Sequence, residues 1–86
     1  GFTARDFTPE ATMAVIEKEV PGIPEAMRMK GSQSTDRAIL SRGVAGIRRK
    51  TLIVNLPGSP RGAKESLEAV LSALPYGLDM IAEREH

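Results

Sequence analysis

Three short segments of the chain carry residue types that bind phosphate groups or metal ions. The first contains Asp6, which follows Arg5 and comes just before an expected helix start. A carboxylate there could hold Mg²⁺, which prefers oxygen ligands and keeps waters and substrate phosphates in its coordination shell. The alternative is structural, because an aspartate in such a loop also orders the first turn of a helix. Both roles are open on the residue types alone.

The second segment is Ser41-Arg42-Gly43, which combines a hydroxyl, a guanidinium and a flexible backbone after a short expected helix. Arginine suits phosphate because its planar guanidinium can form two parallel hydrogen bonds. The alternative is a cation near the C-terminal end of a helix, where it interacts favourably with the helix dipole. The segment is therefore a candidate anion site with a plain structural alternative.

The third segment follows a run of leucine and β-branched residues, Leu52–Val54. A run without polar alternation predicts a strand that is buried on both faces of a parallel sheet. Pro57 and Gly58 end this strand, Ser59 is a good helix N-cap and Pro60 fits the first helical position. Ligands bind at the carboxyl ends of strands in open α/β sheets, and a helix N-terminus attracts phosphate. A connection that binds nothing fits the same residues.

The remaining charged residues give weaker signals. Five basic residues lie near one another in the sequence, and together they could bind an anionic ligand or nucleic acid. The alternative is that they are solvated side chains of a turn and of the first turn of a helix. The residues are Arg48, Arg49, Lys50, Arg61 and Lys64. The single histidine, His86, is terminal and has no cysteine or histidine near it. A Ser-His-Asp set is therefore absent, and covalent acyl chemistry of that type is not expected.

Turn and cap residues divide the chain into the elements that must position these segments. Thr8 as N-cap and Pro9 predict a helix whose apolar positions continue to Val20, where Pro21-Gly22 ends it. A helix at 24–29, which Gly31 ends, and a helical turn from Thr35 or Asp36 to Leu40 are expected next. A strand at 44–48 and a turn at 49–50 follow. The last expected element is a helix from Pro60 with an apolar stripe to Leu74, and Pro75 should kink this helix or begin a new one.

Composition narrows the class of protein. The chain has 86 residues, a net charge of +1 and no cysteine, which excludes a disulfide framework and thiolate metal sites. No apolar run reaches the roughly 18–20 residues that span a bilayer, and no signal-peptide pattern is present. The near-neutral charge and an aromatic content of 3% argue against a nucleic-acid binder. We expect neither a membrane nor a nucleic-acid partner.

A strand buried on both faces needs neighbours on both sides, and the sequence offers only one further strand, at 44–48. Two strands make a marginal sheet. We therefore expect residues 1–86 to be the C-terminal part of a single larger α/β domain whose N-terminal half is absent.

Four separated blocks together resemble the molybdopterin adenylyltransferase family, which includes the G domain of gephyrin. The blocks are Gly1-Phe2-x-x-Arg5-Asp6-x-Thr8-Pro9-Glu10-Ala11-Thr12, Pro21-Gly22, Leu40 to Arg48, and Leu52 to Pro60. The resemblance covers about Gly1 to Leu74. It implies a three-layer α/β sandwich with a mostly parallel sheet, a cytoplasmic homotrimer, and Mg²⁺-dependent transfer of an adenylyl group from ATP to molybdopterin, which releases pyrophosphate.

By this resemblance, Asp6 is the family's essential aspartate and helps position Mg²⁺ or the reacting phosphate. Ser41 and Arg42 match the Leu-Ser-Arg motif near the molybdopterin phosphate. The residues expected to line the substrate pocket are Asn55, Pro57, Gly58, Ser59 and Pro60. Gly1 would be the last glycine of the family's Gly-Gly-Thr-Gly-Phe motif and a substrate contact.

The preceding residues of that glycine-rich motif, and a further functional aspartate of the family, are absent from the chain. The chain alone should therefore be inactive. The alternative function is a molybdopterin-binding or trimeric scaffold module without catalysis. A third possibility is a related competence-damage or molybdenum-insertion domain, although the block from Arg5 to Pro9 fits the adenylyltransferase branch better.

Overall fold

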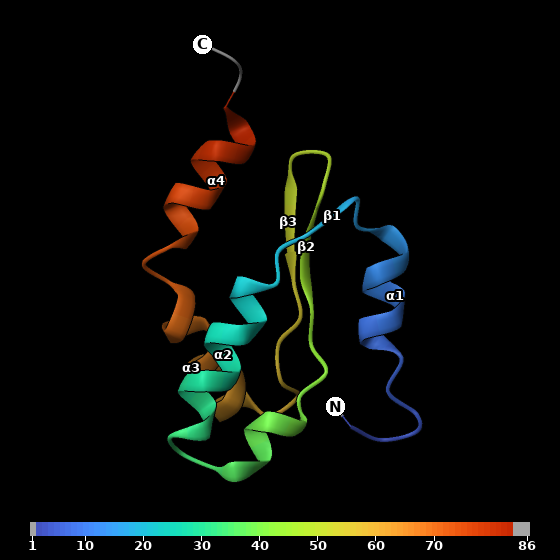
Figure 1. The fold of residues 1–86 in the computed structure, drawn as a ribbon, viewed down its shortest axis with the longest axis vertical. Helices are drawn as coiled ribbons and strands as arrows, with labels where there is room; N and C mark the ends of the chain where they lie inside the picture. Colours follow the sequence, from blue (N-terminus) through green and yellow to red (C-terminus); the bar gives the residue numbers. More distant parts are fainter. Residues whose placement is uncertain (1, 84–86) are drawn as a thin grey trace.

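The computed structural model describes residues 2–83, and Gly1 and His86 lie outside this range. The described residues form helices and a small sheet, so the expected α/β class is confirmed (Figure 1). The elements in chain order are α1 (Thr8–Val15), β1 (Lys18–Glu19), α2 (Gly22–Ser32), the 3₁₀ helix η1 (Asp36–Leu40), β2 (Ala45–Arg48), β3 (Thr51–Val54), α3 (Pro60–Val70) and α4 (Leu74–Ala82).

The sheet has the order β1-β2-β3, and both of its pairings are antiparallel. Within the described residues β3 pairs only antiparallel, with β2, and the parallel sheet expected around Leu52–Val54 stays a prediction. β2 and β3 form a hairpin in which Arg48 lies opposite Thr51, and the two-residue turn places Arg49 at a positive φ of 55°. Positive φ is what tight hairpin turns require, although glycine or asparagine usually supplies it.

β1 is a strand that the sequence pattern did not predict. The helix expected to reach Val20 ends instead at Val15, and Ile16 already has an extended backbone. The chain then pairs Lys18 with Ile47 and Glu19 with Gly46. A Cβ on Gly46 would lie only 2.7 Å from the Lys18 carbonyl oxygen, so this close approach requires glycine. Pairing between distant segments has overridden the helical pattern.

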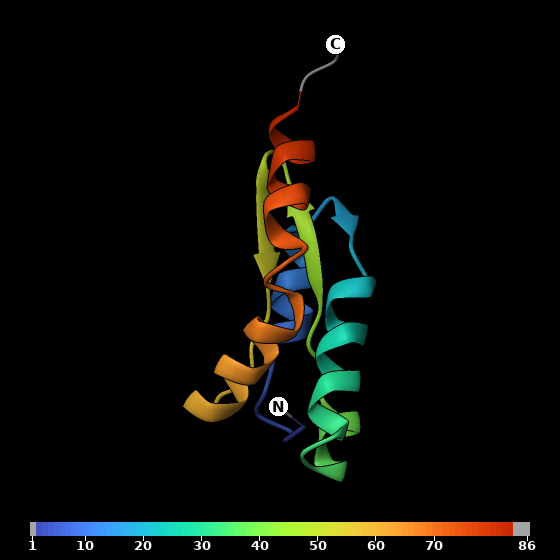
Figure 2. The same cartoon turned by 90° about the vertical axis from the view of Figure 1, so that its left-hand side faces the viewer.

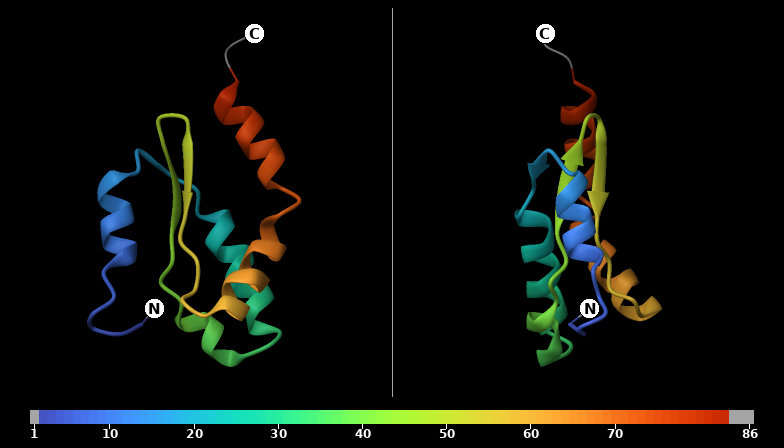
Figure 3. Two further views of the ribbon diagram at one scale, coloured as in Figure 1. Left: turned by 180° about the vertical axis from the view of Figure 1, so that it is seen from behind. Right: turned by 90° about the vertical axis from the view of Figure 1, so that its right-hand side faces the viewer.

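Helices lie on both sides of the sheet. α1 is on one side, whereas α2, α3 and α4 are on the other (Figures 1 and 3). α2 packs against α3 and η1, and α4 packs against β3. α4 contacts β3 and α1 contacts β2, and Leu52, Ile53 and Val54 are only half-buried. The prediction that this strand is buried on both faces is therefore wrong within the described residues.

Most of the expected caps and boundaries are confirmed. Ser59 caps α3, and its hydroxyl accepts a hydrogen bond from the Gly62 N–H at 3.0 Å. Thr35 caps η1, and Pro75 lies in the first turn of the new helix α4. Three details are wrong. α2 begins at Gly22 rather than Pro24, and it continues through Gly31 to Ser32. The N-cap of α1 is Phe7 rather than Thr8.

The described residues leave a large apolar surface open. The chain exposes 6290 Å², whereas a compact protein of 9.3 kDa exposes about 5,000 Å². Its radius of gyration of 13.3 Å also exceeds the roughly 12 Å typical of this length, and Figure 2 shows the elongated shape. The buried apolar side chains are Met27, Ala45 and Val70, while Phe7, Met13, Leu71, Tyr76 and Met80 are among the large ones left exposed.

Candidate functional site

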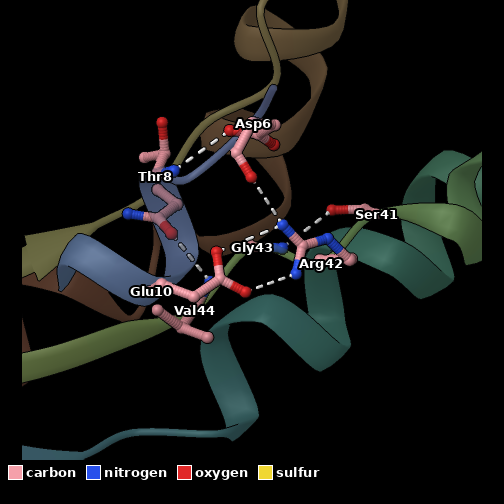
Figure 4. A network of polar contacts seen from close by, with 8 residues as sticks. Asp6, Thr8, Glu10, Ser41, Arg42, Gly43 and Val44 are labelled. Carbon is pink, nitrogen blue, oxygen red and sulfur yellow. Dashed lines mark hydrogen bonds and ion pairs between the residues drawn. The ribbon is translucent and has the colours of Figure 1, made fainter. Parts of the chain in front are cut away.

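Arg42 brings the first two candidate segments together (Figure 4). Its Nη2 donates to the backbone carbonyl of Asp6 at 2.9 Å. Its two terminal nitrogens also donate to the carboxylate of Glu10, Nη1 to Oε2 at 2.7 Å and Nη2 to Oε1 at 3.2 Å. The loop before α1 and the loop after η1, more than 30 residues apart in sequence, therefore meet through one guanidinium.

This ion pair shifts both partners toward their charged forms. The hydrogen bond from Arg42 lowers the pKa of Glu10, and the same bond raises the pKa of Arg42. The side chains are 36% and 57% exposed for Arg42 and Glu10, so water reaches the pair. An anion arriving at Arg42 therefore meets a guanidinium that already has a carboxylate partner, and it would have to share or replace Glu10.

Asp6 has a structural contact of its own. Its Oδ1 accepts a hydrogen bond from the backbone N–H of Thr8 at 3.1 Å, at the start of α1. The structural role considered from the sequence is therefore present: the aspartate, rather than Thr8, satisfies a donor of the first turn. The predicted metal role is a separate matter that this contact neither requires nor prevents.

Ser41 lies beside Arg42 at the end of η1 and is exposed. Its Oγ accepts a hydrogen bond from the Gly43 N–H at 3.3 Å. The backbone of Ser41 is extended, with φ −63° and ψ 131°, so the chain leaves the helix immediately. Ser41 thus lies next to Arg42 but does not line the pocket that Arg42 shares with Asp6, and its contact with a substrate phosphate stays a prediction.

Asn55 connects this loop to α1. Its Oδ1 accepts from the Val44 N–H at 3.1 Å, and its Nδ2 donates to Thr12 Oγ1 at 2.8 Å. Thr12 is buried, with 7% of its surface exposed. The sequence analysis selected Asn55 as a pocket residue but did not identify Thr12 as its partner.

The loop from Pro57 to Pro60 follows β3 at the same end of the molecule's long axis as the loops at 2–7 and 41–44 (Figures 1 and 2). Ser59 is occupied with the α3 cap, and Gly58 has open space around the position of a Cβ. Neither residue lines the small pocket formed by Asp6 and Arg42. The third candidate segment is therefore near the other two along this axis but is not part of that pocket.

The pocket has a volume of about 330 Å³ and is lined by Thr3, Ala4, Asp6, Phe7, Glu10 and Arg42. The residues from 2 to 83 contain no group of three or more carboxylate or imidazole side chains that could form a metal site by themselves. A single carboxylate still suits Mg²⁺, which is often held by one or two carboxylates and the substrate's phosphates. Asp6 fits that role at the edge of the pocket.

The basic group of the sequence does not form a patch. Arg48 and Arg49 are at the hairpin, whereas Arg61 is in the first turn of α3, at the other end of the molecule (Figure 1). Arg48 donates to the Val15 carbonyl at 3.0 Å, and Arg61 pairs with Glu65 at 3.6 Å. The hypothesis that these residues dock one anionic ligand is therefore wrong. No helix within residues 2–83 is long and apolar enough to cross a bilayer.

Fold and site together define an α/β protein with a charged pocket at one end of its sheet. Residues 1–76 match the family model described as a probable molybdopterin binding domain, and the chain belongs to this family. The resemblance inferred from the four sequence blocks is confirmed at this level.

The named relatives are longer than the chain. A molybdopterin adenylyltransferase of Helicobacter pylori is 53% identical over 81 residues, which are 94% of this chain and 46% of that protein. Gephyrin of Dictyostelium discoideum is 44% identical over 81 residues, 94% of this chain and 11% of that protein. The crystal structure of the molybdopterin biosynthesis enzyme MoaB from Thermus thermophilus is 58% identical, with a TM-score of 0.86, over 94% of this chain and 51% of that one. The chain thus spans about half the length of these bacterial proteins.

Proposed function

We propose that the protein carrying this chain transfers an adenylyl group from ATP to molybdopterin in molybdenum cofactor biosynthesis. The observation that carries the proposal is the Arg42 cluster, which unites the Asp6 loop with the Ser41 loop around one charged pocket. The family assignment and the relatives named molybdopterin adenylyltransferase support it.

The chemistry suits these residue types. Adenylyl transfer needs its phosphates held in line and their charge neutralised, and it needs no covalent nucleophile from the protein. Arg42 and the Ser41 hydroxyl would contact the molybdopterin phosphate. Asp6 would hold Mg²⁺, which supplies charge neutralisation for the triphosphate of ATP.

We also propose that the chain is the C-terminal half of a three-layer domain with a mostly parallel sheet, which works as a cytoplasmic homotrimer. The exposed surface area of the chain is roughly a quarter larger than that of a compact protein of this mass, which supports the proposal that a further part of the domain covers it. β3 supports it as well, because it is an edge strand of the described sheet and could pair with a further strand. Gly1 and the Pro57–Pro60 loop would then contact substrate in the completed domain.

The test is a pair of substitutions at Asp6 in the full-length protein. Asp6→Asn keeps an oxygen that can accept the Thr8 N–H but removes the negative charge, whereas Asp6→Ala removes both. If the carboxylate positions the metal or the reacting phosphate, both variants bind molybdopterin and neither releases pyrophosphate from ATP. Asp79→Asn, an exposed change in α4, is the control and should keep full activity. Normal turnover in Asp6→Asn would remove Asp6 from the mechanism.

The same assay decides between the enzyme and the scaffold alternative. A wild-type protein that forms trimers and binds molybdopterin, yet releases no pyrophosphate from ATP and Mg²⁺, would be a binding module. Sedimentation and equilibrium binding of molybdopterin give the first two answers, and a pyrophosphate assay gives the third.

A further inference from the structure

Arg28 contacts the Ser41 loop from the side opposite to α1. It is half-buried in α2, the helix that packs against η1. Its Nη1 lies 3.3 Å from the backbone carbonyl of Ser41 and 3.3 Å from that of Gly43, and it donates to both. One guanidinium nitrogen therefore holds the two carbonyls that flank Arg42.

This arrangement holds the backbone on both sides of Arg42. Carbonyls two residues apart lie on the same side of an extended segment. With the carbonyls of Ser41 and Gly43 turned toward α2, the side chain of Arg42 reaches the Asp6 carbonyl and Glu10 on α1 (Figure 4). Two arginines therefore connect the loop to its neighbours: Arg28 binds it from α2, and Arg42 binds Glu10 of α1.

We propose that Arg28 is a positioning residue that sets Ser41 and Arg42 in place for an anionic substrate group, an inference that rests on the proposed adenylyl transfer. Both hydrogen bonds are long, and the Ser41 carbonyl is exposed enough for water to replace its partner. Losing the bond to Ser41 therefore costs little folding free energy, and losing the part-buried bond to Gly43 costs what one modest hydrogen bond contributes. The loss instead frees the loop, so that the substrate contacts must be ordered at each binding event.

The experiment compares Arg28→Met with Arg28→Lys in the full-length protein. Methionine keeps the length and helix propensity of the side chain but has no N–H donor, whereas lysine keeps a donor and a charge. Lys30→Met, two residues further along α2 and exposed, is the matched control. Two readouts are needed: amide hydrogen exchange and steady-state kinetics with molybdopterin.

Exchange reports loop order without any turnover. The amides to follow are those of Ser41, Gly43 and Val44, whose acceptors are the Ala38 carbonyl, Ser41 Oγ and Asn55 Oδ1. In Arg28→Met we expect these amides to exchange about fivefold faster, the factor that one modest hydrogen bond makes in an equilibrium constant. The amides of β3 and the melting temperature should change little, and Arg28→Lys should lie between the wild type and Arg28→Met.

Kinetics then separates positioning from simple support of the fold. Arg28→Met should raise KM for molybdopterin about fivefold with a smaller change in kcat, while Lys30→Met matches the wild type. Unchanged loop exchange in Arg28→Met, or faster exchange that spreads through α2 with a large loss of melting temperature, would overturn the inference. A wild type without turnover would refute the proposed function instead, and equilibrium binding of molybdopterin would then replace KM as the second readout for Arg28.

Discussion

Asn55 and Thr12 are joined by a hydrogen bond of 2.8 Å that ties the segment after β3 to a buried position of α1. The other end of the same amide accepts from the Val44 N–H. Three segments far apart in sequence therefore depend on one side chain. Asn55 was expected to line the substrate pocket. In the structure its side chain connects backbone and side-chain groups of the protein, and a substrate contact would be an additional role.

The first prediction concerns this connection. Thr12→Val leaves the Asn55 amide without its acceptor and should cost about 1–2 kcal/mol of unfolding free energy, while Asn55→Ala also strands the Val44 N–H and should cost about 2–3 kcal/mol. In the double variant the two costs should fall short of additive by about 1 kcal/mol. Urea unfolding of the full-length protein measures all four species.

Thr51→Val, an exposed change at the start of β3, is the control and should alter stability by less than about 0.5 kcal/mol. Additive costs for Thr12 and Asn55 would mean that the two side chains are not coupled in solution.

The second prediction uses the two glycines Gly46 and Gly22. Gly46→Ala places a Cβ 2.7 Å from the Lys18 carbonyl and against Ile16, so β1 must shift, at a cost of about 1–3 kcal/mol. Gly22→Ala, at the first position of α2, meets nothing within 4 Å and should be neutral or slightly stabilising. Thermal unfolding compares them, and equal stability of the two variants would show that β1 does not lie so close to β2.

The third prediction is a pH dependence. Because the hydrogen bond from Arg42 lowers the native pKa of Glu10 below its ordinary 4.5, the pair stabilises the fold fully above pH 4.5. The benefit is lost as the pH falls through the lower native pKa. The melting temperature of the wild type should therefore exceed that of Glu10→Gln at pH 7, and the two should converge in acid. High salt should also reduce the difference, since the pair is exposed.

Glu25→Gln in α2, also exposed, is the matched control for the loss of one carboxylate. A difference between wild type and Glu10→Gln that stays constant down to pH 2 would contradict an electrostatic origin.

The fourth prediction separates the two roles considered for Ser59. Ser59→Ala removes the acceptor for the Gly62 N–H and should cost about 1 kcal/mol, whereas Ser59→Asp keeps an acceptor and should restore stability. If the start of α3 faces a substrate phosphate, the added negative charge should raise KM for molybdopterin in the full-length protein. Normal KM in Ser59→Asp would exclude this helix start from the substrate pocket.

Local signals predicted the helices well because caps and prolines act within one turn. Ser59 with Pro60 at the start of α3, Thr35 at η1, and Pro75 at α4 all lie where the sequence placed them. The errors arose where a distant segment decided the outcome. Residues 16–20 have the apolar spacing of a helix, but residues 18 and 19 pair with β2, where Gly46 allows the close approach. A local sequence pattern cannot predict this pairing, because β2 is distant in the sequence.

The site followed the same rule. Residue types identified Asp6, Ser41 and Arg42, and the structure brings the Asp6 backbone within 2.9 Å of Arg42. Glu10 as the partner of Arg42, Thr12 as the partner of Asn55, and the role of Arg28 depend on contacts across 13 to 43 residues of sequence. Spacing could not reveal them, because side-chain pairs at such separations are set by the fold.

The open edge of β3 affects how the oligomeric state of residues 1–86, prepared by themselves, should be interpreted. Within the described sheet its outer backbone edge has no neighbouring strand, and it is rich in branched apolar side chains. Such an edge can form backbone hydrogen bonds with other extended polypeptides, including another copy of the same chain. Dimers or higher oligomers of the isolated polypeptide would then result from pairing at this edge rather than from the proposed trimer interface, and they should disappear once another strand occupies the edge.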